Sequence, residues 1–260
     1  MSEVVKASRD GAVLEVTLDR PKANAIDAAT SRRMGEVFAG FRDDPELRVA
    51  IVTGAGERFF SAGWDLKAAA EGETPDADFG VGGFGGLQEL PDLNKPVIAA
   101  VNGMAVGGGF ELFLAADLVV AAEHAEFFLS ELRMGVVPDA ASFRLPKQLP
   151  RPVLMEMLLT SRHLSARDAQ GLGLVNQVVA GPDVMDAARE MAGEILKASP
   201  LAMAATLEII RMGEGLSVAE CYRTMRNKGF PAFERLLASE DIKEGPRAFA
   251  EKRDPVWRGR

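Results

Sequence analysis

Apolar positions in the first half of the chain recur with two different periods. Residues 12–18 alternate between polar and apolar side chains, which predicts a half-exposed strand that ends at Asp19-Arg20-Pro21. Asp27 can cap a helix that runs to about Arg42 and turns one apolar face inward. Residues 48–53 form a nearly continuous apolar run and predict a buried strand. The start of the chain therefore alternates strands with a helix.

The same signals then repeat further along the chain. Residues 59–67 predict a turn that enters a short helix, whereas residues 71–86 contain many glycines and acidic residues and predict a mobile loop. Strands are expected at residues 97–101 and 117–122, on either side of a glycine-rich segment and its helix. A repeated unit of strand, strand and helix favours an α/β core with parallel strands.

The second half of the chain is predicted to be mostly helical. Helices are expected over residues 152–160, 165–171, 182–197, 200–212, 217–237 and 241–253, with one last strand over residues 173–179. Their Met, Leu and Phe stripes fit packing in a core as well as a lid or an oligomer surface. We expect a catalytic core over residues 1–198 and a helical C-terminal region over residues 199–260.

Composition and charge narrow the class of protein. The 260 residues suffice for a substantial core, and 47% hydrophobic with 26% charged residues is typical of soluble globular proteins. The 38 acidic residues outnumber the 30 basic ones, and the formal charge of -8 argues against a broad nucleic-acid or anionic-membrane surface. Cys221 is the single cysteine, so no intrachain disulfide or zinc site is indicated. Without a signal peptide or a membrane-spanning apolar run, the sequence predicts a cytoplasmic protein.

Two glutamates stand out because each lies in an otherwise apolar segment. Glu111 closely follows three consecutive glycines, Gly107-Gly108-Gly109, and Glu131 follows a second apolar run. Glycines let another group approach the backbone, and free N–H groups at a helix start attract negative charge. Two carboxylates in one apolar pocket have pKa values pushed apart, which supplies a general acid and a general base. Structural roles stay open here: Glu111 can complement a helix dipole, and Glu131 can pair with Arg133 or Arg144.

Three motifs, in this order, resemble the enoyl-CoA hydratase/isomerase (crotonase) superfamily. They are Ser61-Ala62-Gly63-Trp64-Asp65-Leu66-Lys67, the run Gly107-Gly108-Gly109-Phe110-Glu111, and Glu131. The resemblance spans the whole chain and implies a ClpP/crotonase-like fold, in which a spiral of ββα units precedes a helical C-terminal region. Within the superfamily, the carnitinyl-CoA dehydratase subfamily is most similar. The segments that carry this finer resemblance are residues 21–27, 61–70, 74–80 and 251–257.

The resemblance implies a hydro-lyase that acts on an acyl-CoA thioester, in this subfamily carnitinyl-CoA and crotonobetainyl-CoA. Coenzyme A then belongs to the substrate, and neither a separate cofactor nor a metal is implied. By position, the backbone N–H groups of Trp64 and Gly108 would hold the thioester oxygen, where enolate charge develops. Glu111 would position or activate the water at C3, and Glu131 would exchange the proton at C2.

The resemblance also implies contacts with coenzyme A and homotrimers or homohexamers. The residues at the family's CoA-binding positions are Ala62, Leu66, Lys67, Phe233 and Lys252. A quaternary ammonium has no N–H to donate, so aromatic faces or diffuse negative charge suit it best. We expect the substrate pocket to be shaped by Trp64, Phe84 or Phe128 together with Asp139.

The chain departs from the family after Pro138. Where relatives commonly have glycines, it reads Asp139-Ala140-Ala141-Ser142-Phe143, and the extra side-chain atoms bear on substrate choice rather than on the two-glutamate chemistry.

Other functions remain as alternatives. A general short-chain enoyl-CoA hydratase would use the same two glutamates, whereas isomerases of the family often manage with one. A thioester hydrolase is disfavoured because His124 and His163 lack a nucleophile motif. The run Gly54-Ala55-Gly56 lacks the third glycine of a dinucleotide fingerprint. A non-catalytic acyl-CoA-binding protein would not need both glutamates.

Overall fold

The apolar runs of the first half form a six-stranded sheet in this computed structural model, which describes residues 3–260. Its strands lie in the order β1 (Val5–Asp10), β2 (Val13–Leu18), β3 (Val49–Gly54), β5 (Val97–Val101), β7 (Leu118–Ala122) and β10 (Gln177–Val179). β1 and β2 are antiparallel, and each following pair is parallel. β3 and β5 are buried along their whole length, as expected for central strands covered on both faces.

A second sheet has four short strands, in the order β4 (Phe59–Ser61), β6 (Met104–Val106), β8 (Glu126–Phe128) and β9 (Leu164–Ser165). β4, β6 and β8 are parallel, and β9 runs antiparallel to β8. After each of β3, β5 and β7 the chain continues into a strand of the second sheet and then a helix. These helices are α2 (Leu66–Ala70), α3 (Gly108–Leu114) and α4 (Glu131–Met134). The predicted repeat of two strands and a helix is confirmed.

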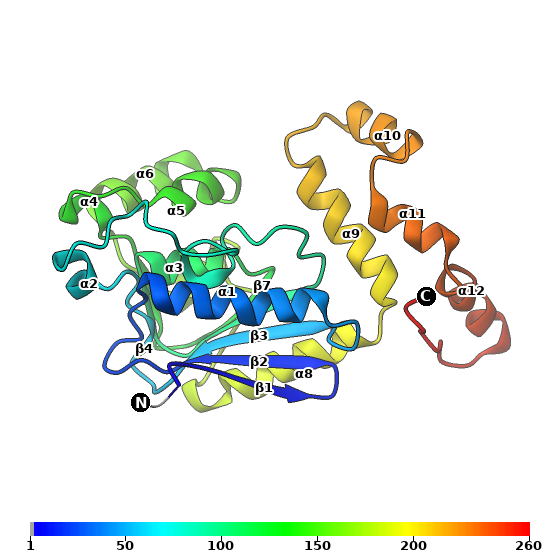
Figure 1. The fold of residues 1–260 in the computed structure, drawn as a ribbon, viewed down its shortest axis with the longest axis horizontal. Coiled ribbons are helices and arrows are strands. Elements are labelled where there is room, and N and C mark those ends of the chain that lie inside the picture. Colours follow the sequence, from blue (N-terminus) through cyan, green and yellow to red (C-terminus); the bar gives the residue numbers. More distant parts are fainter. Residues whose placement is uncertain (1–2) are drawn as a thin grey trace. The chain divides into compact units, whose positions relative to one another are not determined.

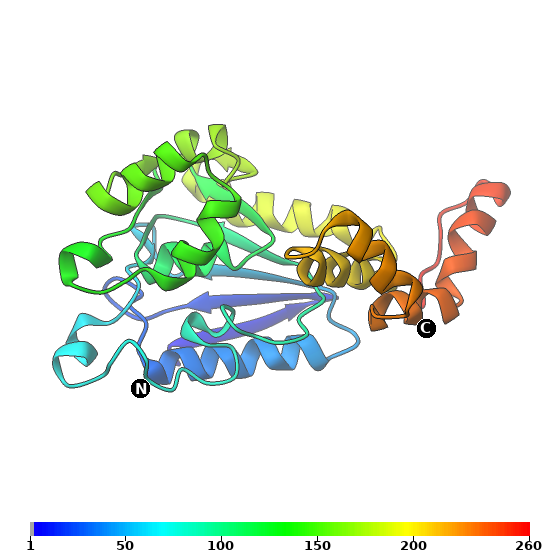
Figure 2. The same ribbon diagram turned by 90° about the horizontal axis from the view of Figure 1, so that it is seen from above.

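Helices cover both faces of the six-stranded sheet (Figures 1 and 2). α1 (Ala28–Asp43) lies on one face and begins where predicted, because the Asp27 carboxylate accepts a hydrogen bond from the Thr30 N–H at 2.7 Å. The first part of α8 (Val184–Leu196) lies on the other face and buries small alanine side chains there. The core therefore sits on both sides of β3 and β5.

Short helices fill the rest of this part of the chain. They are α5 (Asp139–Arg144), α6 (Arg151–Thr160) and α7 (Ala166–Gly171), together with the 3-10 turns η1 (Phe84–Gly86), η2 (Leu145–Lys147) and η3 (Gly181–Asp183). α5 packs against α3, and η1 packs against α1 and α3. The predicted loop over residues 71–86 thus ends in an ordered turn beside the glycine-rich helix.

The C-terminal helices are α9 (Pro200–Gly213), α10 (Val218–Arg226), α11 (Pro231–Ala238) and α12 (Asp241–Glu251). α11 packs against both α9 and α12. The prediction of one helix over residues 217–237 is wrong, because the chain leaves α10 at Asn227 and passes through Lys228 with a φ of 57°. Pro231 has no N–H to continue a helix, but it fits the first position of α11.

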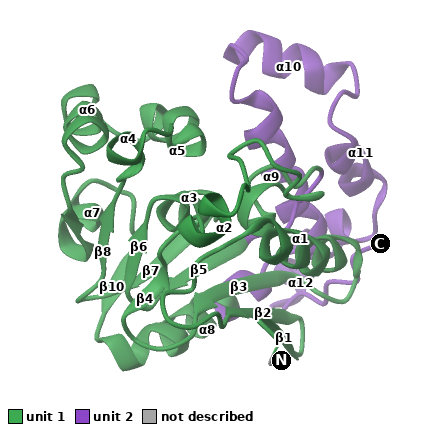
Figure 3. Ribbon diagram, turned by 60° about the vertical axis from the view of Figure 1, so that its left-hand side comes forward, with its two compact units in different colours: residues 1–91, 97–192 green, residues 92–96, 193–260 purple. Residues whose placement is uncertain are grey.

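The chain forms two compact units (Figure 3). The first comprises residues 1–91 and 97–192, and the second comprises residues 92–96 and 193–260. The second unit contains the helices α9 to α12, and the predicted role of this region in oligomerisation and CoA contacts stays a prediction. Within residues 3–260, none of the helices has the length and apolar character needed to cross a lipid bilayer.

Candidate active site

Glu111 lies in the first turn of α3 and is only 6% exposed. Its Oε1 accepts a hydrogen bond from the Ala141 N–H at 2.9 Å, near the start of α5. Burial is the main cause that raises the pKa of Glu111 to about 7; the charges of Glu131 and Asp139 raise it further, and the Ala141 hydrogen bond opposes them. Near neutral pH, this carboxyl group is therefore divided between its protonated and charged forms, which suits proton transfer.

Glu131 is the first residue of α4, and one of its carboxylate oxygens is unsatisfied. Oε2 is buried and has no hydrogen-bond partner within residues 3–260. Burial raises the pKa of Glu131, and the charge of Asp139 adds to this effect. The alternative pairing with an arginine is not found, since Arg133 donates to the Thr160 carbonyl at 2.7 Å and Arg144 donates to the Gln88 carbonyl at 3.0 Å.

Gly107 brings the start of α3 against Glu131. A Cβ added at Gly107 would lie 2.6 Å from Oε1 of Glu131, and the backbone there has a φ of 55°. A side chain at this position would both strain the backbone and displace the carboxylate. The glycine run thus lets the α3 backbone and the Glu131 carboxylate share one small space.

The turn after β4 lies against the start of α3. A Cβ added at Gly63 would lie 2.6 Å from the Gly108 nitrogen, so the two segments are in close contact. Ile26 pairs with this turn, donating to the Gly63 carbonyl at 2.8 Å and accepting from the Asp65 N–H at 2.9 Å. Within residues 3–260, the N–H groups of Trp64 and Gly108 donate no hydrogen bond to another part of the protein. Free amides at such a junction can stabilise a developing oxyanion.

Phe84, in η1, lies over the same backbone. A Cβ added at Gly108 would lie 2.5 Å from its ring, which also packs edge-on against Phe79 at 5.5 Å between centroids. Asp139 is exposed at the start of α5, and its charge raises the pKa of both site glutamates. Phe84 therefore lies beside Gly108, and Asp139 lies near the two glutamates.

Phe128 contacts His163 through its side chain and the start of α3 through its backbone. Its ring stacks on the ring of His163 with 3.8 Å between centroids, while its carbonyl accepts the Gly107 N–H at 3.0 Å. The Trp64 indole N–H donates to Glu73 at 2.7 Å. The predicted contacts of these two aromatic side chains with a substrate stay predictions.

Sequence and structure comparisons identify the family of the chain. The model of the enoyl-CoA hydratase/isomerase family matches residues 8–260. The chain belongs to this family. A curated relative in Salmonella paratyphi A, named carnitinyl-CoA dehydratase, is 60% identical over 261 residues, which cover 100% of both chains.

Solved structures of enoyl-CoA hydratases have the same fold. The enzyme from Mycobacterium tuberculosis H37Rv aligns with a TM-score of 0.88 and 39% identity, over 99% of each chain. A carnitinyl-CoA hydratase from Mycobacterium avium aligns with a TM-score of 0.78 and 41% identity, over 100% of each chain. The predicted crotonase superfamily and fold are confirmed, as is the likeness to carnitinyl-CoA dehydratases.

The predicted CoA-binding residues fall in both compact units. In the first unit, the Ala62 N–H donates to the Ala23 carbonyl at 2.9 Å, and Leu66 and Lys67 are exposed on α2. In the second unit, Phe233 is half-buried in α11, and Lys252 is exposed at the end of α12. Their contacts with coenzyme A stay predictions.

In the described part of the chain, the contacts of the two histidines do not include a nucleophilic side chain. His124 Nε2 lies 3.0 Å from the Glu57 carbonyl oxygen, and His163 Nδ1 lies 3.1 Å from Oε2 of Glu126. The first partner is a backbone carbonyl, and the second is a carboxylate. The hydrolase alternative therefore gains no support from these contacts.

Sequence reasoning missed two residues that hold the site in place. The Ala141 amide binds Glu111, and the Glu73 carboxylate binds Trp64. The unusual segment after Pro138 gave a signal for Ala141, whereas Glu73 lies in a segment treated only as a loop. The sequence does not show which residue either of them contacts, because both contacts form only when the chain folds.

Proposed function

We propose that the protein catalyses the reversible hydration and dehydration of an acyl-CoA thioester, with carnitinyl-CoA and crotonobetainyl-CoA as its substrate pair. The observation that carries this proposal is the proximity of the buried Glu111 to Glu131, which has a buried, unsatisfied oxygen and lies against the start of α3. Membership of the enoyl-CoA hydratase/isomerase family supports the reaction. The 60% identical relative named carnitinyl-CoA dehydratase supports the substrate.

In the dehydration direction, Glu131 takes the proton from C2 of carnitinyl-CoA. Negative charge then develops on the thioester oxygen, where the N–H groups of Trp64 and Gly108 stabilise the enolate more than the ground-state carbonyl. The C3–O bond breaks as Glu111, in its protonated form, donates a proton to the leaving hydroxyl, so that water is released. Hydration runs through the same steps in reverse, with Glu111 activating water.

The division of roles follows from the two carboxyl groups. Glu111, with its pKa raised to about 7, is available as an acid near neutral pH. Glu131 has a free oxygen that can receive a proton. Because the charge of Glu131 acts on Glu111, the two titrate as a coupled pair.

The quaternary ammonium of the substrate is attached at C4, next to the carbon that gains or loses water. Asp139 supplies a negative charge close to both glutamates, and Phe84 supplies an aromatic ring at Gly108. Diffuse negative charge and aromatic faces favour such a cation. We assign the recognition of the ammonium group to these two residues.

The rest of the proposal follows from the acyl-CoA chemistry. The reaction uses no separate cofactor, since coenzyme A is part of the substrate. We further propose a cytoplasmic homotrimer or homohexamer in which the second unit contributes to oligomer contacts and to CoA binding through Phe233 and Lys252.

The test is to add crotonobetainyl-CoA or crotonyl-CoA to the purified protein and follow the loss of enoyl-thioester absorbance. We expect faster consumption of crotonobetainyl-CoA, without release of free CoA thiol in a parallel thiol assay. Faster consumption of crotonyl-CoA would favour a general short-chain enoyl-CoA hydratase. Thiol release would indicate a thioester hydrolase, and binding without turnover would indicate an acyl-CoA-binding protein.

A further inference from the structure

One carboxylate fastens the segment that carries the Trp64 amide. The indole N–H of Trp64 donates to Oε1 of Glu73 at 2.7 Å, and the other oxygen of Glu73 accepts the Ala28 N–H at 2.9 Å. α2 lies between Trp64 and Glu73 in sequence. The Glu73 side chain therefore closes the segment 64–73 on itself and ties it to the start of α1.

The contact is well suited to fixing an orientation. Ala28 is the first residue of α1, and its N–H belongs to the first turn, where N–H groups have no partner within the helix. A carboxylate is favoured there by the helix dipole, and its hydrogen bonds are charge-assisted. Because both oxygens of Glu73 are used, rotation of the carboxylate would break one bond or the other.

Trp64 is also held through its chain neighbours. Asp65 forms an ion pair with Arg20 at 2.7 Å, and Arg20 reaches Asp27 at 2.8 Å. The peptides on either side of Trp64 bind Ile26 through the Gly63 carbonyl and the Asp65 N–H. The start of α1 thus braces the backbone of this turn, and Glu73 braces its largest side chain.

We propose that Glu73 is a positioning residue for the reaction, because it fixes the Trp64 indole and thereby holds the Trp64 amide at the thioester oxygen. The proposal rests on the proposed function, in which that amide stabilises the enolate. Glu73 itself does not contact the substrate. Displacement of a preorganised group by about 1 Å can cost about 100-fold in rate. Loss of the hydrogen bond between Glu73 and Trp64 therefore lowers kcat more than it raises KM.

Three single variants test the hydrogen bond between Glu73 and Trp64 by changing either its acceptor or its donor. Glu73→Ala removes the acceptor, Trp64→Phe removes the indole donor but keeps the amide, and Glu73→Gln keeps one acceptor oxygen. We expect Glu73→Ala and Trp64→Phe to lower kcat by about 10- to 100-fold, and Glu73→Gln to retain more activity than Glu73→Ala. The matched control is Glu71→Gln, which changes an exposed glutamate of the same segment and leaves kcat unchanged.

A spectroscopic readout separates positioning from a general loss of structure. A bound dienoyl-CoA chromophore, 2,4-hexadienoyl-CoA, absorbs at longer wavelength when donors polarise its thioester carbonyl. We expect this shift in the wild-type protein and in Glu71→Gln, and a smaller shift in Glu73→Ala and Trp64→Phe. Combining Glu73→Ala with Trp64→Phe lowers kcat little beyond either single change, because both remove the same hydrogen bond.

The outcomes distinguish this inference from the proposed function. If folded Glu73→Ala and Trp64→Phe retain the wild-type kcat and absorbance shift, Glu73 does not position the amide. A lower melting temperature with an unchanged shift likewise overturns the inference, because the role is then only structural. If the wild-type protein neither shifts the chromophore nor turns over an enoyl-CoA, the proposed function itself fails.

Discussion

Buried carboxylates occur in both compact units, but their oxygens are used differently. In the second unit, Glu208 accepts the N–H groups of Ala232 at 2.7 Å and Phe233 at 3.3 Å, at the start of α11. In the first unit, the Ala141 N–H binds Glu111, whereas Glu131 keeps a buried oxygen without a partner in the described chain. Burial alone therefore does not mark a catalytic acid. The informative feature is a buried carboxylate oxygen left unsatisfied.

Asp241 follows the same rule as Glu208. It is 3% exposed and accepts hydrogen bonds from the Ser199 hydroxyl at 3.2 Å and from the backbone N–H groups of Arg258 at 2.9 Å and Gly259 at 3.1 Å. These bonds fasten the end of the chain to α12. Asp241 is thus a structural carboxylate, despite being more buried than Glu111.

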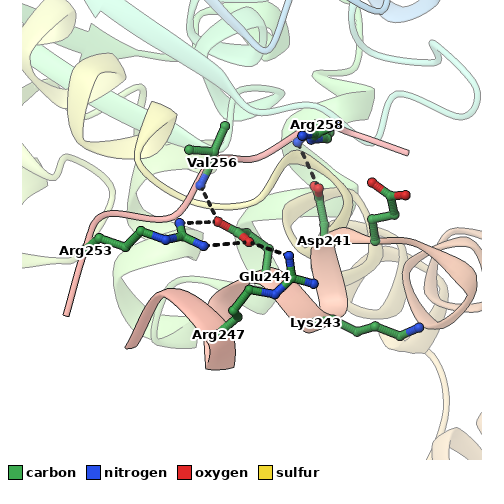
Figure 4. Close-up of a pocket in the computed structure, with 8 residues that line it drawn as sticks. Asp241, Lys243, Glu244, Arg247, Arg253, Val256 and Arg258 are labelled. Atoms are coloured by element: carbon green, nitrogen blue, oxygen red, sulfur yellow. Dashed lines mark hydrogen bonds and ion pairs between the residues drawn. The ribbon is translucent and has the colours of Figure 1, made fainter. Parts of the chain in front are cut away.

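A cavity of about 620 Å³ in the second unit sharpens the contrast (Figure 4). Its lining residues are Glu240, Asp241, Lys243, Glu244, Arg247, Arg253, Val256 and Arg258. Glu244 pairs with Arg253 and accepts the Val256 N–H at 2.9 Å, and these contacts hold the pKa of Glu244 at about 2. Glu244 therefore remains ionised at neutral pH, whereas Glu111 has a pKa near neutrality.

The largest predicted difference between the two kinds of carboxylate is in catalysis. Glu111→Gln and Glu131→Gln each lower kcat by about 10²- to 10⁴-fold, because an amide can neither give nor take the proton. The matched change Glu208→Gln leaves kcat within a few-fold of wild type. Initial rates with crotonobetainyl-CoA and CoA affinity from calorimetry test this. A fully active Glu111→Gln or Glu131→Gln variant would overturn the acid and base assignment.

The second prediction concerns stability and pH. The folded-state pKa of Glu111 is raised to about 7 from an ordinary value of 4.5. The native state binds this proton more tightly, so the contribution is fully present below pH 4.5 and is lost as the pH rises through 7. Relative to Glu111→Gln, the wild-type free energy of unfolding should fall by about 3 kcal/mol across this range.

Denaturant unfolding at several pH values measures this difference. Glu123→Gln, an exposed change in the same unit, serves as the control and should follow the wild-type curve. Parallel wild-type and Glu111→Gln curves would mean that the carboxyl group of Glu111 titrates as it does in the unfolded chain.

The third prediction concerns the contribution of Glu208 to stability. Glu208→Ala leaves the N–H groups of Ala232 and Phe233 without their acceptor at the start of α11. We expect a loss of about 1–3 kcal/mol in the free energy of unfolding, as for other buried donors left unpaired. Glu190→Ala, on an exposed position of α8, should change it by less than about 0.5 kcal/mol. Equal effects of the two changes would remove the structural role assigned to Glu208.

Much of the fold was predictable because local signals agreed with tertiary packing. The apolar runs of β3 and β5 and the Asp27 cap of α1 each lie within a few residues of chain. β1 was missed because five of its six residues are exposed and no alternation marks it. The break between α10 and α11 depends on Pro231, whose effect was outweighed by the apolar stripe on both sides.

Some residues of the candidate site could likewise be predicted from the sequence, and others could not. Glu111 and Glu131 were found because a charged residue in an apolar run is conspicuous in a sequence. The partners that orient the site, the Ala141 amide and Glu73, are a backbone group and a loop acid. Ala141 lies 30 positions from Glu111, and Glu73 lies 9 positions from Trp64, on the other side of α2. Only folding brings such pairs together.

The smallest predicted effect concerns Asp139, which belongs to neither kind of carboxylate. It is exposed, yet its charge raises the pKa of both Glu111 and Glu131. Asp139→Asn removes that charge, so the pKa values of the two glutamates fall and the pH profile of kcat/KM moves to lower pH. Because Asp139 is exposed, water and salt screen its charge, and the shift is a fraction of a pH unit that shrinks at high ionic strength. If Asp139 also attracts the quaternary ammonium, KM rises for crotonobetainyl-CoA but not for crotonyl-CoA. A pH profile that moves with KM unchanged for both substrates would restrict Asp139 to tuning the two glutamates.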